Sequence, residues 1–115
     1  MLPAGVRIFV CTEPQDMRRS FDRLAQAARQ VVGEDPQGGA LFVFTSKSAR
    51  RIKVLWWDRN GFCLLYKRLH RAVFVLPKPT TAERPVARID GAALATLLAG
   101  VTHAPRTRGL TRDRR

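Results

Sequence analysis

Carboxylates that could hold divalent metal ions for cutting a phosphodiester backbone are scattered in this chain. Such chemistry requires several carboxylates that converge on a pair of metal ions about 4 Å apart. Asp16 and Asp90 each precede a helical pattern and are predicted helix caps. Asp58 falls at a predicted hairpin turn, and Glu34 and Asp35 lie in a loop sequence. These structural roles account for most of the candidate carboxylates, so we predict that the protein is not an enzyme.

The other reactive side chains are equally dispersed. His70 stands between cations, His103 lies near the C-terminal end, and no serine occupies a recognisable nucleophile turn. Cys11 and Cys63 fall inside apolar strand-like runs, where a free thiol usually behaves as a small buried hydrophobe. No local Cys or His pair has zinc-ligand spacing, and the glycine pair at 38–39 lacks the Lys-Ser/Thr of a phosphate loop. We therefore predict no catalytic residue, no metal and no cofactor.

Positive charge is the chemical feature in excess. Lys and Arg number 21 against 9 Asp and Glu, which gives a formal charge of +12. A compact domain with that excess repels itself unless an anionic partner screens it, and nucleic acid is the commonest such partner. An acidic membrane surface is the rival, but the apolar runs are far shorter than the roughly 20 residues that a membrane span requires. MLPAGVRIFV also lacks the pattern of a signal peptide, so we expect a cytoplasmic protein.

The run IKVLWWDRNGFCLLYKRL at 52–69 contains aromatic side chains that could stack on bases. Stacking contributes about 1–3 kcal/mol per base in proteins that bind single strands. Trp56 and Trp57 are adjacent in a predicted strand, however, so they point to opposite faces and at most one can face a given ligand. Both faces of the hairpin are apolar, which is typical of a sheet that helices cover on both sides. We therefore interpret both tryptophans as core residues.

Cations gather at one end of this hairpin. Asn60-Gly61 favours a tight turn in which both residues take positive φ, although a four-residue loop over 58–61 is also possible. Either turn gives the same faces, with Trp57, Leu55 and Lys53 on one side together with Leu64, Tyr66 and Arg68. The apolar residues lie near the turn, and Lys53, Lys67 and Arg68 lie at the far end. The connecting segments add Lys47, Arg50, Arg51, His70 and Arg71. We predict that this end is a rim that binds DNA phosphates, and the alternative is a merely solvated sheet end.

The elements that position this rim include a strand and a helix that are predicted in the first half of the chain. RIFVCT at 7–12 predicts a strand, which Pro14 prevents from continuing. A helix is predicted from Asp16 to Gly33, and its apolar stripe consists of Met17, Phe21, Leu24, Ala28 and Val31. If Phe21 is fully buried there, its truncation to Ala should cost about 3–5 kcal/mol. EDPQGG at 34–39 is a loop by composition.

The second half of the chain is predicted to contain a sheet and one further helix. Four short β-rich runs form a predicted meander, at 40–45, 52–57, 62–69 and 72–77. An irregular segment at 78–85 and an extended VARI lead to Asp90, the predicted N-cap of a last helix that ends near Gly100. Its apolar side carries Leu94, Leu97, Leu98 and Val101. The first strand could lie parallel to a meander strand, because a helix separates it from the next strand.

The predicted fold is therefore α+β, with a small mixed, mainly antiparallel sheet. A meander of about four strands and the N-terminal strand form this sheet, and two helices pack on it.

Residues 1–101 are expected to be a single domain and residues 102–115 a disordered basic tail, because the tail has too few apolar residues to repay the entropy of ordering. Removing the tail should weaken DNA binding and flatten its salt dependence. The predicted DNA-binding residues are Lys47, Arg50, Arg51, Lys53, Lys67, Arg68 and Arg71, with Arg106, Arg108, Arg112, Arg114 and Arg115 in the tail.

Several stretches of the chain resemble one known family in their order and composition. They follow a short N-terminal strand and are DMRRSFDRL at 16–24, GALFVF at 39–44, RIKVLWWDRNGFCLLYKRL at 51–69 and FVLP at 74–77. Together they resemble the TnpB accessory proteins, which the second open reading frame encodes in the sixty-six family of bacterial insertion sequences. The resemblance covers about residues 5–99. These proteins are distinct from the RNA-guided nuclease of the same name.

The chain departs from the usual pattern of this family at three positions and at its end. Acidic or glycine residues are common where it has Arg59 and Asn60, and an acidic residue is common at His70. The arginine-rich tail is not part of the family signature. These departures make the chain more basic than the pattern predicts.

The resemblance implies a non-catalytic accessory role in transposition, beside a separate transposase. In one hypothesis the protein binds DNA electrostatically and holds or bends the ends of the element. In the other it is a protein adaptor that binds the transposase without contacting DNA, and its charge either is a solubility feature or fits an acidic patch there. RNA binding is a third, minor option. We favour DNA as the direct partner, although the sequence contains no readable motif such as a helix-turn-helix and predicts neither a preferred DNA sequence nor an oligomeric state.

Overall fold

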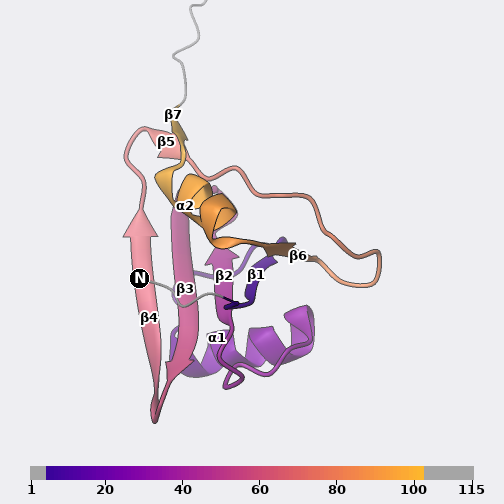
Figure 1. Cartoon of the computed structure of the whole chain (residues 1–115). Coiled ribbons are helices and arrows are strands. Elements are labelled where there is room, and N and C mark those ends of the chain that lie inside the picture. Colours follow the sequence, from indigo (N-terminus) through magenta and orange to yellow (C-terminus); the bar gives the residue numbers. More distant parts are fainter. Residues whose placement is uncertain (1–4, 103–115) are drawn as a thin grey trace, which may run out of the picture.

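A five-stranded sheet is the centre of the fold in the computed structural model, which describes residues 5–102 (Figure 1). The order of its strands is β4-β3-β2-β1-β6. Their bounds are β1 Ile8–Cys11, β2 Leu41–Thr45, β3 Arg51–Asp58, β4 Gly61–Arg68 and β6 Val86–Ile89. β1 and β2 are parallel, and the other neighbouring strands are antiparallel. The predicted α+β fold with a mixed, mainly antiparallel sheet is confirmed.

Helices cover both faces of this sheet. α1 (Phe21–Ala27) continues directly into a π-helix, η1 (Ala28–Val32), and this segment packs on one face, while α2 (Gly91–Ala99) packs on the other (Figure 1). Because successive strand residues alternate, Phe42 and Phe44 join the core under α1 and η1, whereas Val43 joins the core under α2. Strand β2 is therefore buried along its whole length, as a strand between two helical layers should be.

The first helix begins later than predicted, because Asp16 closes a turn instead of capping a helix. Its carboxylate accepts a hydrogen bond from the backbone N–H of Arg18 at 2.9 Å. The backbone N–H of Gln15 donates to the Thr45 carbonyl at 2.9 Å, which ties this segment to the end of β2. Ser20 is the N-cap of α1, with an extended backbone. The helix ends as predicted at Gly33, whose φ is 86°.

The late start of α1 changes the environment of Phe21. It is the first residue of the helix and is 42% exposed, so its predicted place in the core is wrong. The large cost predicted for its truncation therefore does not apply. The buried residues of this helical segment are Leu24, Ala25, Ala27, Ala28 and Val32, and Met17 is buried from the preceding turn.

The run at 72–77 does not extend the meander. Only β5 (Ala72–Val73) is a strand there, and it pairs with β7 (Val101–Thr102) in a separate two-stranded sheet. The chain turns away from β4 at Arg71, whose φ is +59°, and the backbone N–H of Phe74 then donates to the Ala49 carbonyl. Phe74 is buried in the core under α2. The place of a fifth strand in the main sheet is taken by β6, which pairs with β1.

The turn of the β3–β4 hairpin also differs from the predicted one. Asp58 pairs with Gly61, so the two-residue loop is Arg59-Asn60. Arg59 has a φ of 57°, whereas neither Asn60 nor Gly61 takes a positive φ. The predicted turn at Asn60-Gly61 is wrong by one residue, but the predicted faces of the two strands are correct, because Leu55 lies opposite Leu64.

The second helix begins as the sequence predicts. The Asp90 carboxylate accepts a hydrogen bond from the Ala93 backbone N–H at 2.8 Å, and Gly100 ends the helix with a φ of 74°. Val101 is 55% exposed in β7 and does not belong to the buried side of the helix. Within residues 5–102, no helix has the length and apolar character needed to cross a membrane.

Candidate nucleic-acid interface

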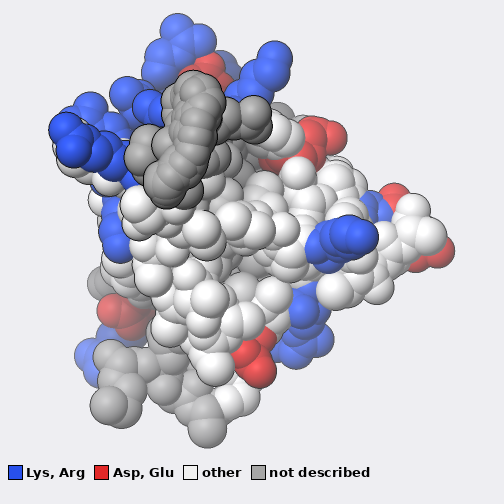
Figure 2. All heavy atoms as spheres, turned by 90° about the horizontal axis from the view of Figure 1, so that it is seen from above, with Lys and Arg blue, Asp and Glu red and all other residues white. Residues whose placement is uncertain are grey.

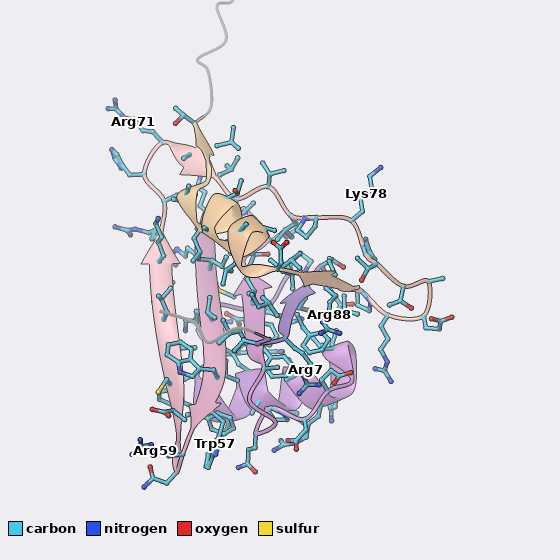
Figure 3. The ribbon with its side chains drawn as sticks, in the orientation of Figure 1. Arg7, Trp57, Arg59, Arg71, Lys78 and Arg88 are labelled. Carbon is cyan, nitrogen blue, oxygen red and sulfur yellow. The ribbon has the colours of Figure 1, made fainter. Side chains whose placement is uncertain are left out.

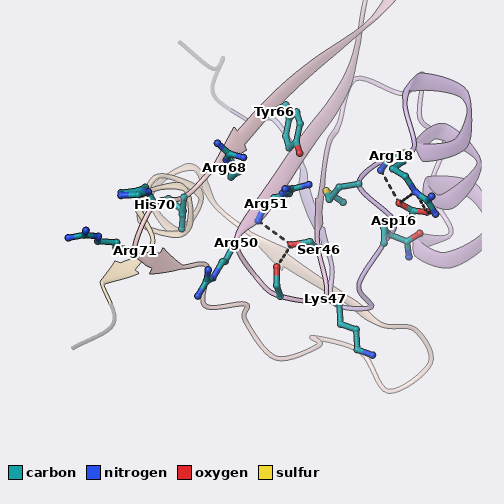
Figure 4. A pocket seen from close by; sticks show the side chains of 14 residues that line it. Asp16, Arg18, Ser46, Lys47, Arg50, Arg51, Tyr66, Arg68, His70 and Arg71 are labelled. Atoms are coloured by element: carbon teal, nitrogen blue, oxygen red, sulfur yellow. Dashed lines mark hydrogen bonds and ion pairs between the residues drawn. The ribbon is translucent and has the colours of Figure 1, made fainter. Parts of the chain in front are cut away.

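A hollow with a volume of about 1140 Å³ lies at the end of the sheet where β4 finishes (Figure 4). Three segments surround it: the turn that follows β1, the loop between β2 and β3, and the residues from the end of β4 onward. We call it the basic hollow, after the six cations that line it. These are Arg18, Lys47, Arg50, Arg51, Arg68 and Arg71.

Backbone hydrogen bonds fix the two loops that carry most of these cations. The Ser46 backbone N–H donates to the Arg51 carbonyl at 2.9 Å, and the Ser46 hydroxyl accepts from the Arg51 backbone N–H at 3.1 Å. The Leu69 backbone N–H donates to the Arg50 carbonyl at 2.8 Å, which joins the second loop to the first. Arg50 and Arg51 are therefore held beside the segment that contains Arg71 by main-chain contacts and not by ion pairs.

The hollow has a strong excess of positive charge. Asp16 is the one carboxylate among its lining residues, and it pairs with Arg18 at 2.7 Å. Within residues 5–102 the only other ion pair joins Arg7 to Glu34, so five of the six cations have no carboxylate partner in that range. In the view of Figure 2, which looks onto this end, Lys and Arg gather most densely to the left and along the upper edge.

The pair of Asp16 and Arg18 shifts both of their pKa values. The hydrogen bonds from the Arg18 side chain and backbone hold the pKa of Asp16 well below its ordinary value, and the charges of Arg18 and Arg19 add to this effect. Hydrogen bonding to Asp16 raises the pKa of Arg18 in return. Asp16 therefore stays ionised and offsets one of the charges in the hollow.

Five of the seven cations predicted within the domain line the basic hollow, and two do not. Lys53 is buried, with 6% of its surface exposed, and its Nζ donates to the Arg19 carbonyl at 2.7 Å. Lys67 lies on the opposite face of β4, where its Nζ donates to the Leu98 carbonyl at 2.7 Å near the end of α2. The five predicted tail arginines lie outside the described residues.

The sequence analysis did not select Arg18 and Tyr66 as site residues. Arg18 falls within the helix predicted from Asp16 to Gly33, and it reaches the hollow because the helix starts after it. Tyr66 is 51% exposed and lines the hollow beside Arg51 and Arg68 (Figure 4). The signal for Tyr66 was present, because the predicted register already placed it on one face with Lys53 and Arg68.

The two tryptophans do not line the hollow. Trp56 is partly buried and packs on the core under α2. Trp57 makes an edge-to-face contact with Phe62, with ring centroids 4.9 Å apart. Figure 3 places Trp57 beside Arg59 at the opposite end of the molecule from Arg71. Both tryptophans are only partly buried, so the core interpretation is correct only in part, and neither of them lines the hollow.

Residues 5–102 contain no group of three His, Cys, Asp or Glu side chains that could hold a metal ion. Burial raises the pKa of the Cys11 thiol, which donates to the Glu13 carbonyl at 3.3 Å. A raised thiol pKa disfavours the reactive thiolate.

The chain is similar to one known protein family and to individual known proteins. The family described as "IS66 Orf2 like protein" matches residues 6–108, a range that includes all six cations of the basic hollow. The chain is 42% identical over 103 residues to the uncharacterized protein y4hO of Sinorhizobium fredii (strain NBRC 101917 / NGR234), covering 88% of this chain and 87% of that protein. It is 36% identical over 73 residues to the uncharacterized protein y4jC of the same strain, covering 64% and 62% of the two chains.

No solved structure shows a significant match to the chain. The family match and the relatives confirm the resemblance inferred from the sequence. The chain belongs to the IS66 Orf2-like family.

Proposed function

We propose that this protein is a non-catalytic accessory of transposition that binds DNA through the basic hollow, beside a separate transposase. The family supports the role in transposition. The observation that carries the DNA-binding part is the gathering of six cations from three segments around one hollow that contains a single carboxylate among its described lining residues. Like charges gathered in this way destabilise a fold unless an anion binds among them. We expect the protein to bind DNA in the cytoplasm.

The chemistry of the hollow suits phosphate groups better than base edges. Five of its six cations are arginines, whose planar guanidinium groups donate paired hydrogen bonds to phosphate oxygens. Contacts of this kind position a protein on DNA without reading its sequence. We therefore propose electrostatic binding to the ends of the element, in which the tail arginines Arg106 to Arg115 add a nonspecific arm.

The test is a charge-matched comparison of two triple variants. Arg50→Gln, Arg51→Gln and Arg71→Gln together remove three cations of the hollow, so the slope of log K against log salt should fall by up to about 3. Arg23→Gln, Arg29→Gln and Lys78→Gln remove the same charge from exposed positions outside the hollow and should leave the slope nearly unchanged. An equal fall in both folded variants, or no fall in either, would contradict binding at the hollow.

The alternative function is that of a protein adaptor, and a second hollow favours it. This apolar hollow of about 540 Å³ lies between α2 and the segment 75–77, and the exposed Val75 and Val101 line it. An adaptor would bind the transposase through such a surface without contacting DNA. Co-purification with the transposase after nuclease treatment, together with no salt-dependent DNA binding by the isolated protein, would support the adaptor over the DNA-binding role.

A further inference from the structure

We propose that the basic hollow takes unpaired nucleotides of single-stranded DNA, and that Tyr66 stacks on one base. This inference rests on the proposed DNA binding and adds the class of DNA. Tyr66 is the one Phe, Tyr or Trp among the described residues that line the hollow, and 51% of its surface is exposed. It lies on β4, which is an edge strand of the sheet, so no further strand of the described chain stands beside it.

The Tyr66 ring is held from one side. Its partner across the hairpin is Lys53, whose Nζ lies over the ring at 4.8 Å from the centroid. Lys53 is itself fixed, because it is buried and donates to the Arg19 carbonyl at 2.7 Å. Because the cation covers one face of the ring, a base would stack on the other face.

Arginines flank this exposed ring on the same face of the sheet. Arg68 follows Tyr66 by two residues, a spacing of roughly 7 Å along a strand. Arg51 lies directly opposite Arg68 in the register of the β3–β4 hairpin. A base stacked on Tyr66 would therefore have its backbone phosphates within reach of both guanidinium groups (Figure 4).

This combination selects unpaired nucleotides over a duplex. In a duplex the faces of the bases are stacked on one another, so a tyrosine at its surface meets sugars, phosphates and base edges but no free base face. Proteins that bind single strands combine a cationic groove with aromatic side chains on which bases stack. An exposed tyrosine alone would be ordinary, and the inference depends on the arginines that share its face and its hollow.

The experiment measures binding of the full-length protein and its variants to two labelled probes, an oligothymidylate of about 20 nucleotides and a duplex of about 20 base pairs, either of which can span the hollow. Tyr66→Leu keeps an apolar strand residue but removes the stacking ring. It should weaken binding to the oligothymidylate by about 5- to 150-fold, the range expected for one lost stack. Duplex affinity and both salt slopes should stay unchanged, because no charge is removed.

Two further variants are the controls. Tyr66→Phe keeps the ring and should bind the oligothymidylate as the native protein does. Leu65→Ala changes the neighbouring exposed residue, which points to the other face, and should alter neither affinity. Melting curves of each variant establish that it is folded.

The possible outcomes separate this inference from the proposed function. If folded Tyr66→Leu binds the oligothymidylate like the native protein while the triple arginine variant loses salt dependence, the stacking inference is wrong and DNA binding stands. The inference is also wrong if Tyr66→Leu weakens both probes equally. If the native protein binds neither probe in a salt-dependent way, both proposals fail together.

Discussion

Lys53 shows how a buried charged residue can hold a neighbouring aromatic ring in place. Its side chain is buried, its Nζ donates to the Arg19 carbonyl and its charge lies over the Tyr66 ring. The sequence placed Lys53 correctly on the face that bears Tyr66 and Arg68. Its burial depends on where the segment before α1 runs, and that path follows from the turn at Asp16, which no periodic pattern encodes.

The first prediction contrasts Lys53 with Lys47. Lys53→Met keeps most of the side-chain volume but leaves the Arg19 carbonyl without its donor, so it should destabilise the fold by about 1–3 kcal/mol. Lys47→Met changes an exposed side chain and should stay within about 0.5 kcal/mol. Chemical denaturation measures both values. Salt titrations should show the reverse order, with a slope reduced by about 1 for Lys47→Met alone. Equal stabilities would count against the structural role of Lys53.

The second prediction concerns the pH dependence of Asp16. Because Arg18 lowers the pKa of Asp16 in the folded state, the stabilisation from this pair is present above the unfolded value of about 3.9. It is lost as the pH falls below that value toward the folded pKa. An NMR titration of the Asp16 carboxyl carbon should give a depressed pKa that rises toward the ordinary value in Arg18→Gln. Arg23→Gln should not move it, and an unshifted pKa in the native protein would show that the pair does not form in solution.

At the scale of elements, the sequence predicted the strands in which successive side chains alternate between the two faces of the sheet. It also predicted the start of the second helix at Asp90 and the end of the first at Gly33. It misplaced elements whose limits depend on distant contacts. The run at 72–77 is as rich in β-formers as its neighbours, yet Arg71 turns the chain away and Phe74 packs under α2. Composition describes what a segment can form, whereas its pairing depends on which edge remains open when the chain reaches it.

The third prediction tests the hairpin turn. Gly61 lies within β4, takes no positive φ, and a Cβ added to it would meet no atom within 4 Å. Gly61→Ala should therefore stabilise the protein by about 0.4–1 kcal/mol, because it restricts the unfolded chain. A turn at Asn60-Gly61 would instead make the same change destabilising. Gly33→Ala is the control: its φ is 86° and its Cβ would lie 2.7 Å from the Arg84 side chain, so thermal unfolding should show a clear loss of stability.

At the scale of the whole molecule, the sequence predicted an end of the sheet that is rich in cations, and five of the predicted cations line the hollow there. The hollow itself could not be predicted, because it depends on three segments that meet only in the folded chain. Arg18 comes from the turn before α1, whereas Arg71 comes from the segment after β4. Sequence reasoning could assign charges to a hairpin end, but it could not assign Arg18 to the same place.

The pairing of β1 with β6 has a consequence for the way the chain is made. Residues 8–11 find their second neighbour only in residues 86–89, so most of the domain must leave the ribosome before the sheet can close. At roughly 5–20 residues per second, the nascent chain carries an open apolar edge for several seconds. A chain truncated before β6 would keep that edge exposed permanently. It would become a substrate for chaperones and proteases, or a seed for aggregation, and not a smaller working domain.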